Sequence, residues 1–594
     1  MRERLLLKIT SLLRAGMETI DALTIALQLV AWMRESELER IPLPLRYQVT
    51  APPREMAQVA AIFQKLSLEE SLGPNYSAFT PLAVASRYIT PSTLLQILNT
   101  FGQVVLTEPW QATELADFVS GVIGGRTAKF QALPSELADL MVALATPSPS
   151  TRVYLPFESG FHLSYRVRAY TRQTYSTTTY RTPLPWLIDL LSDSDLRILV
   201  GDELRTPLLV QEGQLMQFDV TIAFPLLGER VSEDISTGDF YGRFVETTTS
   251  SVVLAVRHIL AATRGRAVVG VPNGLLFSPG AERSLRTFLL EHQALEGVIA
   301  LPPALLPGTA TQTSLLVLNT SVQHTDVFFV DGTNSAFFQK DGKGRSLLVG
   351  WEQLRDLYFA RQPHPFARLV STRAVLANDA TLQVSRYCLS PEVSEAEAVL
   401  AAYPVAALQT LVQFVRPVAL ADPAGTLPLP EVGPADFPDF GYVTEPGRTV
   451  WVTENNRAKA SRQCLQHQDL ILAMKGSVGK VALVEQPPEL WLTGQSCMIL
   501  RVTDPARIDP RTLYMFLKSG IGQSLLKQIV SAGSTVPLIQ LRELEKLRVP
   551  VPSPAEQRSL IDTFEHLTGL EHQIRRIRSE QDQLVSCLWA TPPR

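Results

Sequence analysis

Short apolar strands alternate with helical stretches between residues 120 and 350, and this alternation limits the possible folds more than any other feature. Runs such as 218–223 and 266–271 are apolar and rich in β-branched residues, whereas 252–262 and 282–291 have helical spacing. Alternating strands and helices form a mostly parallel sheet with helices on both faces. Ligands of such sheets bind at the carboxyl ends of the strands. Further strands are expected at 152–155, 196–200, 295–300 and 314–318.

The sequences on either side predict other kinds of structure. Residues 1–120 carry apolar side chains at helical spacing, interrupted by prolines, which predicts a helical domain. Residues 410–555 read as short strands and turns with one helix at Leu513–Val530. The last segment is one long helix whose apolar residues recur at spacings of three, four and seven, close to a coiled-coil heptad. They are Leu560, Phe564, Leu567, Leu570, Ile574, Ile577, Leu584 and Leu588. An ordinary amphipathic helix packed on its own domain is the alternative.

We therefore expect a multidomain α/β protein. Its parts are a helical domain (1–120), an α/β domain (121–350), a connector (351–409), a second α/β domain (410–555) and a long helix (556–594). The stretch from Pro417 to Pro438 is rich in Pro, Ala and Gly and indicates a boundary or a long loop.

Composition indicates a globular protein that is not embedded in a membrane. Of 594 residues, 45% are apolar and 19% charged, and no run of about 18 apolar residues occurs. The cysteines form no CxxC pair, so we expect no metal site and no disulfide framework, and a cytoplasmic location. They are Cys388, Cys464, Cys497 and Cys587. The net charge of -4 opposes nucleic-acid binding unless basic residues gather on one face.

Four ordered segments resemble the methyltransferase subunit of type I restriction–modification systems. Residues 218–228 read FDVTIAFPLLG and match the family's strand and loop FDVIxANPPFG. Residues 265–277 (GRAVVGVPNGLLF) and 295–303 (LEGVIALPP) match two further stretches, and 129–134 (KFQALP) is similar to a worn geFyTP element. The resemblance implies a Rossmann-like methyltransferase sheet of the N6-adenine DNA methylase family.

The C-terminal third is similar to half of a type I specificity subunit. Residues 469–480 (DLILAMKGSVGK) resemble its DiLisrkGsiGk hairpin, and 494–496 resemble the strand that follows. Residues 517–519, 532–537 and 544–557 resemble its ending, which leads into a long coiled-coil helix. That subunit carries two such target-recognition modules, whereas this chain carries one.

The family's catalytic loop is degenerate in this chain. Members hold the adenine amino group with an Asn or Asp side chain and stack an aromatic ring on the flipped base. The loop here is Phe224, Pro225, Leu226 and Leu227. Phe224 has no polar acceptor and Leu227 has no π face, so the resemblance implies a site without catalytic residues.

The cofactor loop is degenerate as well. The family pattern Asp-Pro-x-x-Gly-x-Gly-Gly becomes LPFESGFH at residues 155–162, and the acidic residue after the second strand is replaced near Gln173. Doubtful remaining contacts with S-adenosylmethionine are Pro156, Ser159, Gly160 and Asp202. An Asp at the end of a strand is more often a helix cap or turn former, and this is the alternative for Asp202. We expect no cofactor, and S-adenosylmethionine only if the methyltransferase is active.

Basic and glycine residues of the C-terminal third are the candidate DNA contacts. Glycines allow close approach and lysines neutralise phosphates. The candidates are Arg457, Lys459, Arg462, Lys475, Gly476, Ser477, Gly479, Lys480, Ser534 and Thr535. A simple β-turn with solvated lysines is the alternative at 475–480, and a capping role is the alternative at 534–535.

The resemblance implies a DNA-binding pseudo-methyltransferase of a restriction or phage-defence system, which recognises double-stranded DNA and recruits effector subunits. A single module favours a homodimer, or effector binding, through the terminal helix. Two other functions stay open. One is an active S-adenosylmethionine-dependent adenine methyltransferase, and the other is an assembly subunit that binds protein alone.

Overall fold

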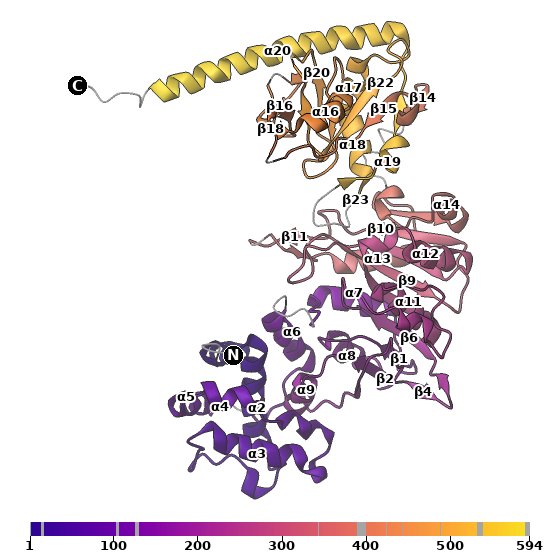
Figure 1. Ribbon diagram of the computed structural model, residues 1–594. Coiled ribbons are helices and arrows are strands. Elements are labelled where there is room, and N and C mark those ends of the chain that lie inside the picture. Colours follow the sequence, from indigo (N-terminus) through magenta and orange to yellow (C-terminus); the bar gives the residue numbers. More distant parts are fainter. Residues whose placement is uncertain are drawn as a thin grey trace, which may run out of the picture. The chain divides into compact units, whose positions relative to one another are not determined.

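The computed structural model divides the chain into two compact units, Met1–Cys388 (unit 1) and Leu389–Arg594 (unit 2). Figure 1 labels the elements of both. The structure describes residues 2–13, 17–102, 106–124, 130–342, 344–388, 399–422, 424–443, 445–487, 489–531 and 538–587. Within those ranges, no helix is long and apolar enough to cross a membrane.

Unit 1 begins with helices packed around the almost wholly buried α2. The buried Arg34 of α2 ties α2 to α9 (Leu184–Ser192), since its Nη2 lies 2.8 Å from Asp193 Oδ2 and its Nη1 donates to the Leu190 carbonyl. The predicted helical N-terminus is therefore confirmed. Its helices are α1 (Arg2–Leu13), α2 (Thr19–Glu37), α3 (Met56–Leu68), α4 (Ala83–Tyr88), α5 (Pro91–Phe101) and α6 (Ala112–Ile123).

A nine-stranded sheet forms the rest of unit 1, in the order β13-β10-β8-β9-β7-β6-β1-β2-β3. All neighbours are parallel except at β9 and at the edge strand β13. The strands are β1 (Val153–Leu155), β2 (Thr174–Thr178), β3 (Ile198–Val200), β6 (Phe218–Ala223), β7 (Thr263–Pro272), β8 (Leu295–Ala300), β9 (Thr313–Asn319), β10 (Asp326–Asp331) and β13 (Ala367–Ser371). The strand order reverses between β1 and β6, which makes their carboxyl ends the expected ligand edge.

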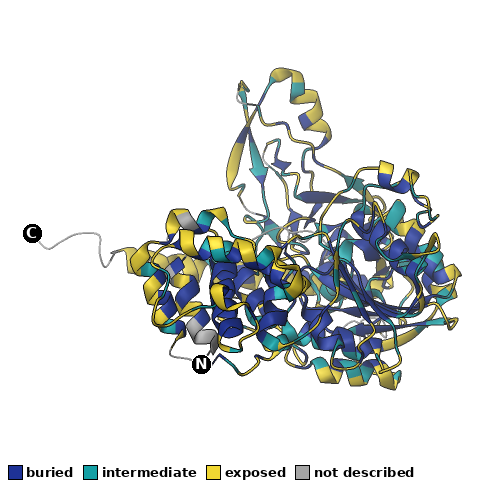
Figure 2. Cartoon of the chain, turned by 90° about the horizontal axis from the view of Figure 1, so that it is seen from below, coloured by how far each residue is buried: buried dark blue, intermediate teal, exposed yellow. Residues whose placement is uncertain are grey.

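Helices cover both faces of this sheet because its strands are apolar on both sides. Val268 of β7 packs against the face that holds α7 and α13, whereas Val269 packs against the face that holds α11 and α12. Figure 2 shows the buried strands beneath helices whose outer sides are exposed. The helices are α7 (Ser135–Ala145), α8 (His162–Val167), α9 (Leu184–Ser192), α10 (Asp234–Thr237), α11 (Ser251–Ala262), α12 (Ala281–Glu291), α13 (Trp351–Ala360) and α14 (Thr372–Ala377). The predicted α/β class is confirmed.

Residues 351–388 belong to unit 1, although the sequence places them in a connector. Strand β13 pairs with β10 at five positions, and α14 packs on α12. The strand shows no apolar run because only Ala367 is buried in it. An edge strand with an exposed face gives no pattern from which a sequence can predict it.

Unit 2 holds a five-stranded sheet, β15-β22-β19-β20-β17, and a three-stranded sheet, β18-β16-β21. Two further strands, β14 and β25, pair with each other. The strands are β14 (Val405–Ala407), β15 (Val412–Val415), β16 (Leu427–Val432), β17 (Tyr442–Val443), β18 (Arg448–Val452), β19 (Leu470–Ala473), β20 (Val481–Val484), β21 (Leu492–Thr493), β22 (Cys497–Val502), β23 (Val530–Ser531), β24 (Leu538–Ile539) and β25 (Arg548–Pro550).

Two elements of unit 2 correct the sequence prediction. The proline-rich stretch contains the strand β16. At Pro428 and Pro430, β16 has a neighbouring strand on one side only, β18. Its other neighbour, β21, pairs only with Glu431 and Val432. A proline is tolerated where its missing N–H would face an unpaired edge. The single helix expected at 513–530 is two, α17 (Pro510–Lys518) and α18 (Gly520–Gln528), since the hydroxyl of Ser519 caps the second.

Helix α20 (Pro554–Cys587) ends the described chain. Its first half packs on unit 2 through Phe564, which is fully buried among the rings of Phe440, Tyr442 and Tyr514. The residues from Arg576 to Ser586 are all exposed. The predicted C-terminal helix is confirmed.

Candidate functional site

The loop after β1 turns its acidic side chain inward. The carboxylate of the buried Glu158 accepts hydrogen bonds from the backbone N–H groups of Leu163 and Ser164, at 2.8 and 3.2 Å, and from the Ser164 hydroxyl. Those N–H groups belong to the first turn of α8. Glu158 therefore occupies the helix N-terminus that faces the ligand edge, where an anionic group of a ligand would otherwise bind.

Hydrogen bonds and packing within the protein also hold the other residues of this loop. The Ser159 hydroxyl accepts a hydrogen bond of 2.8 Å from the backbone N–H of Gln131, which joins the β1 loop to the segment before α7. Phe157 has a φ of 62° and its ring contacts His258 edge-on at 5.8 Å. A Cβ at Gly160 would lie 2.8 Å from the His162 ring, so this glycine serves close packing of the protein on itself. Pro156 is buried.

The remaining cofactor candidates do not form a binding site with this loop. Asp202 follows β3 and is exposed, and its Oδ1 accepts hydrogen bonds from the N–H groups of Leu204 and Arg205, which is the turn-forming role. Gln173 precedes β2 rather than following it, so its proposed place after the second strand was wrong. The residues that follow β2 begin with Thr179, and none of the next three is acidic.

The degenerate catalytic loop is packed into the core. Phe224 is 5% exposed, and its ring lies against the bare Cα of Gly270 on β7, where a Cβ would approach ring carbon Cδ2 to 2.1 Å. Pro225 is buried, and Leu226 and Leu227 are half-buried. This arrangement presents apolar carbon at the end of β6 and offers no side-chain acceptor there.

A buried polar network behind the ligand edge gave no signal in the sequence. Burial lowers the pKa of His258 to about 3, so its imidazole is neutral. Arg243 Nη1 donates to His258 Nδ1 at 3.0 Å, which leaves the proton on Nε2, 2.9 Å from the Tyr154 hydroxyl. Tyr154 and His258 are 104 residues apart, and only the fold brings them together. The network anchors the segment around Arg243 to β1 and α11.

The lysine hairpin of unit 2 is anchored by its backbone and exposes its side chains. It joins β19 to β20, with φ of 77° at Gly476 and 86° at Gly479. The Met474 carbonyl accepts from the Ile539 N–H at 2.9 Å, and the Gly479 carbonyl accepts from Gln523 Nε2 at 3.0 Å. The side chains of Lys475, Ser477 and Lys480 are exposed. Two positive φ values explain why glycines stand at both positions.

Three other proposed DNA contacts lie on a helix that packs against the three-stranded sheet. Arg457, Lys459 and Arg462 are exposed on α16 (Arg457–Arg462), whose Ala460 packs against the three-stranded sheet. Arg457 forms a 3.6 Å ion pair with Glu454. The hairpin belongs to the five-stranded sheet. Ser534 and Thr535 lie outside the described residues.

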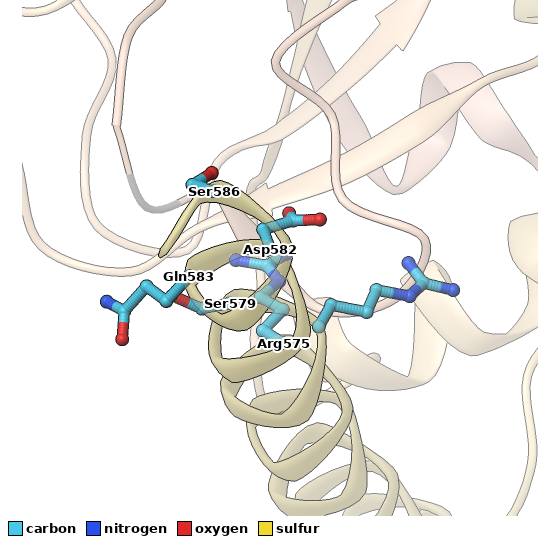
Figure 3. Close-up of a pocket in the computed structure, with 6 residues that line it drawn as sticks. Arg575, Ser579, Asp582, Gln583 and Ser586 are labelled. Atoms are coloured by element: carbon cyan, nitrogen blue, oxygen red, sulfur yellow. The ribbon is translucent and has the colours of Figure 1, made fainter. Parts of the chain in front are cut away.

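The far half of α20 has a polar face and an apolar face. Figure 3 shows side chains on the polar face of α20. The residues of this face are Arg575, Arg578, Ser579, Asp582, Gln583 and Ser586. The apolar stripe is exposed by 40–70%, which is unusual for such large side chains. It consists of Leu570, Ile574, Ile577, Leu584 and Val585.

Comparisons with known proteins identify both units. The N-6 DNA Methylase family matches residues 166–396, and the Type I restriction modification DNA specificity domain matches residues 442–578. The chain joins a type I methylase domain to a type I specificity domain. A curated relative, the MpnII methylase subunit of Mycoplasma pneumoniae, is 28% identical over 145 residues. That match covers 24% of this chain and only 26% of the relative.

Solved structures agree on the fold of the methylase domain. The methyltransferase subunit of a type I system from Streptococcus thermophilus superposes with a TM-score of 0.52 at 17% identity. It covers 65% of this chain and 98% of that one. A chain from a structure on assembly of the type I system gives 0.51 at 16% identity, covering 64% and 89%.

The methylase family implies S-adenosylmethionine, and the residues at the ligand edge do not fit it. The N–H groups at the start of α8 could bind an anionic carboxylate of a ligand, but they already donate to Glu158. A cofactor between the β1 loop and the segment before α7 needs space, but Ser159 and Gln131 are hydrogen-bonded directly.

The buried Glu158 makes a pH dependence testable. Burial raises the pKa of Glu158 to about 7, above that of an unfolded glutamate, so the folded state binds the extra proton. This contribution to stability is complete below about pH 4.5 and is lost as pH rises through about 7. We expect the free energy of unfolding to decline from pH 5 to pH 8 more steeply than in Glu158→Gln, measured by urea titration of both proteins. Equal slopes would contradict the assignment, since all other groups are shared.

Proposed function

We propose that this chain is a DNA-recognition subunit of a restriction or phage-defence system whose methylase domain is a scaffold without methyl-transfer activity. The observation that carries the proposal is Phe224, which stands where the family uses an acceptor for the adenine amino group and is packed on Gly270. In enzymes with an oxyanion hole, loss of one preorganised hydrogen-bonding group costs about 2.7–4 kcal/mol of transition-state stabilisation, and we expect a loss of similar size here. A buried phenyl ring supplies none of this.

The state of the cofactor loop supports the same proposal independently. Glu158 and Ser159 are held by the protein's own α8 and by Gln131. A ligand at this helix end would first have to break the hydrogen bonds that Glu158 accepts from two N–H groups and from the Ser164 hydroxyl, which costs free energy. Two altered sites at one ligand edge favour loss of activity over tolerance of a single change.

The test is a calorimetric titration with S-adenosylmethionine together with methyl transfer to mixed-sequence DNA. We expect neither binding nor transfer. The variant Phe224→Asn with Leu227→Tyr, which restores the catalytic loop, should also stay inactive because Glu158 still occupies α8. Binding and transfer by the natural chain would favour the alternative of an active adenine methyltransferase.

We assign recognition of the DNA sequence to the specificity domain. Its exposed Lys475 and Lys480 stand on a hairpin whose backbone is fixed from two sides, an arrangement suited to contacting phosphates. DNA binding through such contacts weakens steeply as salt is raised. An assembly subunit that binds protein alone would show no such affinity.

A second copy of the chain is the proposed partner of the apolar stripe on α20. Ile577 is 63% exposed and Ile574 43%, and burying both against another helix would remove apolar surface from water. One recognition module per chain then gives two per dimer. We expect Ile577→Glu to weaken self-association more than tenfold by sedimentation, whereas Gln583→Glu on the polar face should have little effect. If the wild-type protein sediments as a monomer at high concentration, the proposal is wrong, and an effector subunit becomes the expected partner of the stripe.

A further inference from the structure

Four arginines gather at the amino ends of three neighbouring strands of the large sheet, opposite the ligand edge. Arg152 stands directly before β1, Arg172 two residues before β2 and Arg197 directly before β3. Arg168 is the C-cap of α8, the helix that leads from the β1 loop back to this edge. Adjacent strands lie about 4.8 Å apart, so the amino ends of β1, β2 and β3 span about 10 Å. These four residues form the arginine edge.

Hydrogen bonds between backbone segments keep three of the arginines close together. Arg168 Nη1 donates to the Arg172 carbonyl at 3.0 Å. The Thr171 hydroxyl donates to the Thr151 carbonyl at 3.0 Å, which joins the residues that precede Arg172 and Arg152. The arrangement therefore belongs to the fold of this edge and does not depend on chance orientations of long side chains.

An aromatic surface supports Arg152. Its guanidinium carbon lies 5.7 Å from the ring centre of Tyr175 and 5.5 Å from that of Phe218, a cation–π arrangement that restricts the side chain. In the parallel register of β2 and β3, Arg197 lies beside Tyr175. Side chains at one level of parallel neighbours point to the same face, so Arg152 and Arg197 flank this tyrosine.

Positive charge exceeds negative charge at this edge. In the part of the chain that the structure describes, no ion pair joins any of the four arginines to a carboxylate. Residues 148–188 hold five arginines and a single carboxylate, Glu158, which is buried at the ligand edge. Asp219 binds Arg264 at 2.7 Å, and Asp195 is an exposed carboxylate before β3. Such an excess stands out in a chain of net charge -4 and favours an anionic partner.

Phosphates of DNA match this arrangement in chemistry and in spacing. A guanidinium binds a phosphate through two parallel hydrogen bonds. Duplex DNA carries one negative charge per about 1.7 Å of its axis, so several phosphates fall within the span of the arginine edge.

We propose that the arginine edge binds the phosphate backbone of double-stranded DNA. This inference rests on the DNA binding proposed above, and it gives the methylase domain a part in it. The domain contributes affinity from the edge opposite its degenerate catalytic loop, and phosphate contacts add no sequence preference.

The experiment uses the full chain and two duplexes, one enriched by the wild-type protein from a random-sequence library and one of unrelated sequence. Arg172 and Arg197 are exposed, so replacing both with glutamine leaves the packing intact. We expect Arg172→Gln with Arg197→Gln to bind both duplexes more weakly by the same factor, about tenfold at low salt. The slope of log affinity against log salt, measured by fluorescence anisotropy, should become shallower by about two. Arg172→Lys with Arg197→Lys should keep the slope, because the charges remain.

The matched control removes the same net charge elsewhere in unit 1. Arg54 and Arg87 are exposed among the N-terminal helices. Arg54→Gln with Arg87→Gln should bind both duplexes like the wild type, with an unchanged salt slope. Equal losses in the two double variants would show that net charge alone is responsible, and would overturn the inference.

The outcomes separate this inference from the proposed function. A wild-type protein that binds neither duplex overturns both. If the wild type binds and the variant of Arg172 and Arg197 binds equally well, only the role of the arginine edge is wrong, and an acidic protein surface becomes its expected partner. A loss confined to the enriched duplex, or one with an unchanged salt slope, would also contradict phosphate binding. Urea unfolding equal to that of the wild type excludes a folding defect as the cause.

Discussion

Replacing Glu246 with alanine is expected to destabilise the methylase domain by about 3–5 kcal/mol, the cost of leaving a buried charge without its partner. Arg257 on α11 donates to Glu246 through Nε at 3.0 Å and Nη2 at 2.5 Å, and both side chains are at most 6% exposed. The guanidinium also lies 3.9 Å from the ring of Phe288 on α12. Without the carboxylate, this cation stays in an apolar environment that water cannot easily enter.

Two control variants test whether the loss of stability in Glu246→Ala comes from the unpaired charge of Arg257. Glu229→Ala removes an exposed carboxylate from the same part of the chain and should change the free energy of unfolding by less than about 0.5 kcal/mol. The double variant Glu246→Leu with Arg257→Met removes both charges and should regain most of the loss. The measurement is urea unfolding of each protein. A loss below about 1 kcal/mol for Glu246→Ala would show that water reaches the pair.

Replacing both hairpin lysines, Lys475 and Lys480, with alanine is expected to weaken DNA binding about tenfold to a hundredfold at low salt. Each phosphate contact that is lost removes about 0.9 from the slope of log affinity against log salt, so the double variant should bind with a slope shallower by about two. Both side chains are exposed while the loop backbone is fixed. The substitution therefore leaves the fold intact.

The matched control is Lys65→Ala, which removes an exposed lysine from α3 of unit 1. Its affinity and salt slope should equal those of the wild type. Equal affinity of the double variant and the control would contradict the phosphate role and favour a plain β-turn with solvated lysines. A weaker affinity with an unchanged slope would point to a structural defect of the hairpin instead.

Local patterns were enough to predict most strands of the large sheet. Runs such as 218–223 and 295–300 are buried on both faces, so their apolar character is continuous and visible. Two largely buried strands, β2 and β10, were not predicted, and the other failures have the opposite cause. Strand β13 has mostly exposed residues, and β16 contains two prolines that only its pairing on one side makes acceptable. The split between α17 and α18 depends on a single cap at Ser519.

The candidate site was predicted only as a set of residue types. That Phe224 lacks an acceptor follows from its chemistry, and the sequence determined this by itself. The hairpin lysines were likewise found from their glycine-containing pattern. The network of Tyr154, Arg243 and His258 was not found, because residues far apart along the chain form it and no spacing rule connects them.

The sequence by itself determined the order of the two α/β domains, most of the strands buried on both faces and the loss of polar groups after β6, because these depend on local residue patterns. Only the tertiary structure decided where the side chains are directed. Glu158 could have faced solvent, but the fold places the first turn of α8 within 2.8 Å of its carboxylate. Gly270 leaves space that the Phe224 ring fills. The contact between Phe224 and Gly270 joins segments that are far apart along the chain, and local sequence carries no information about it.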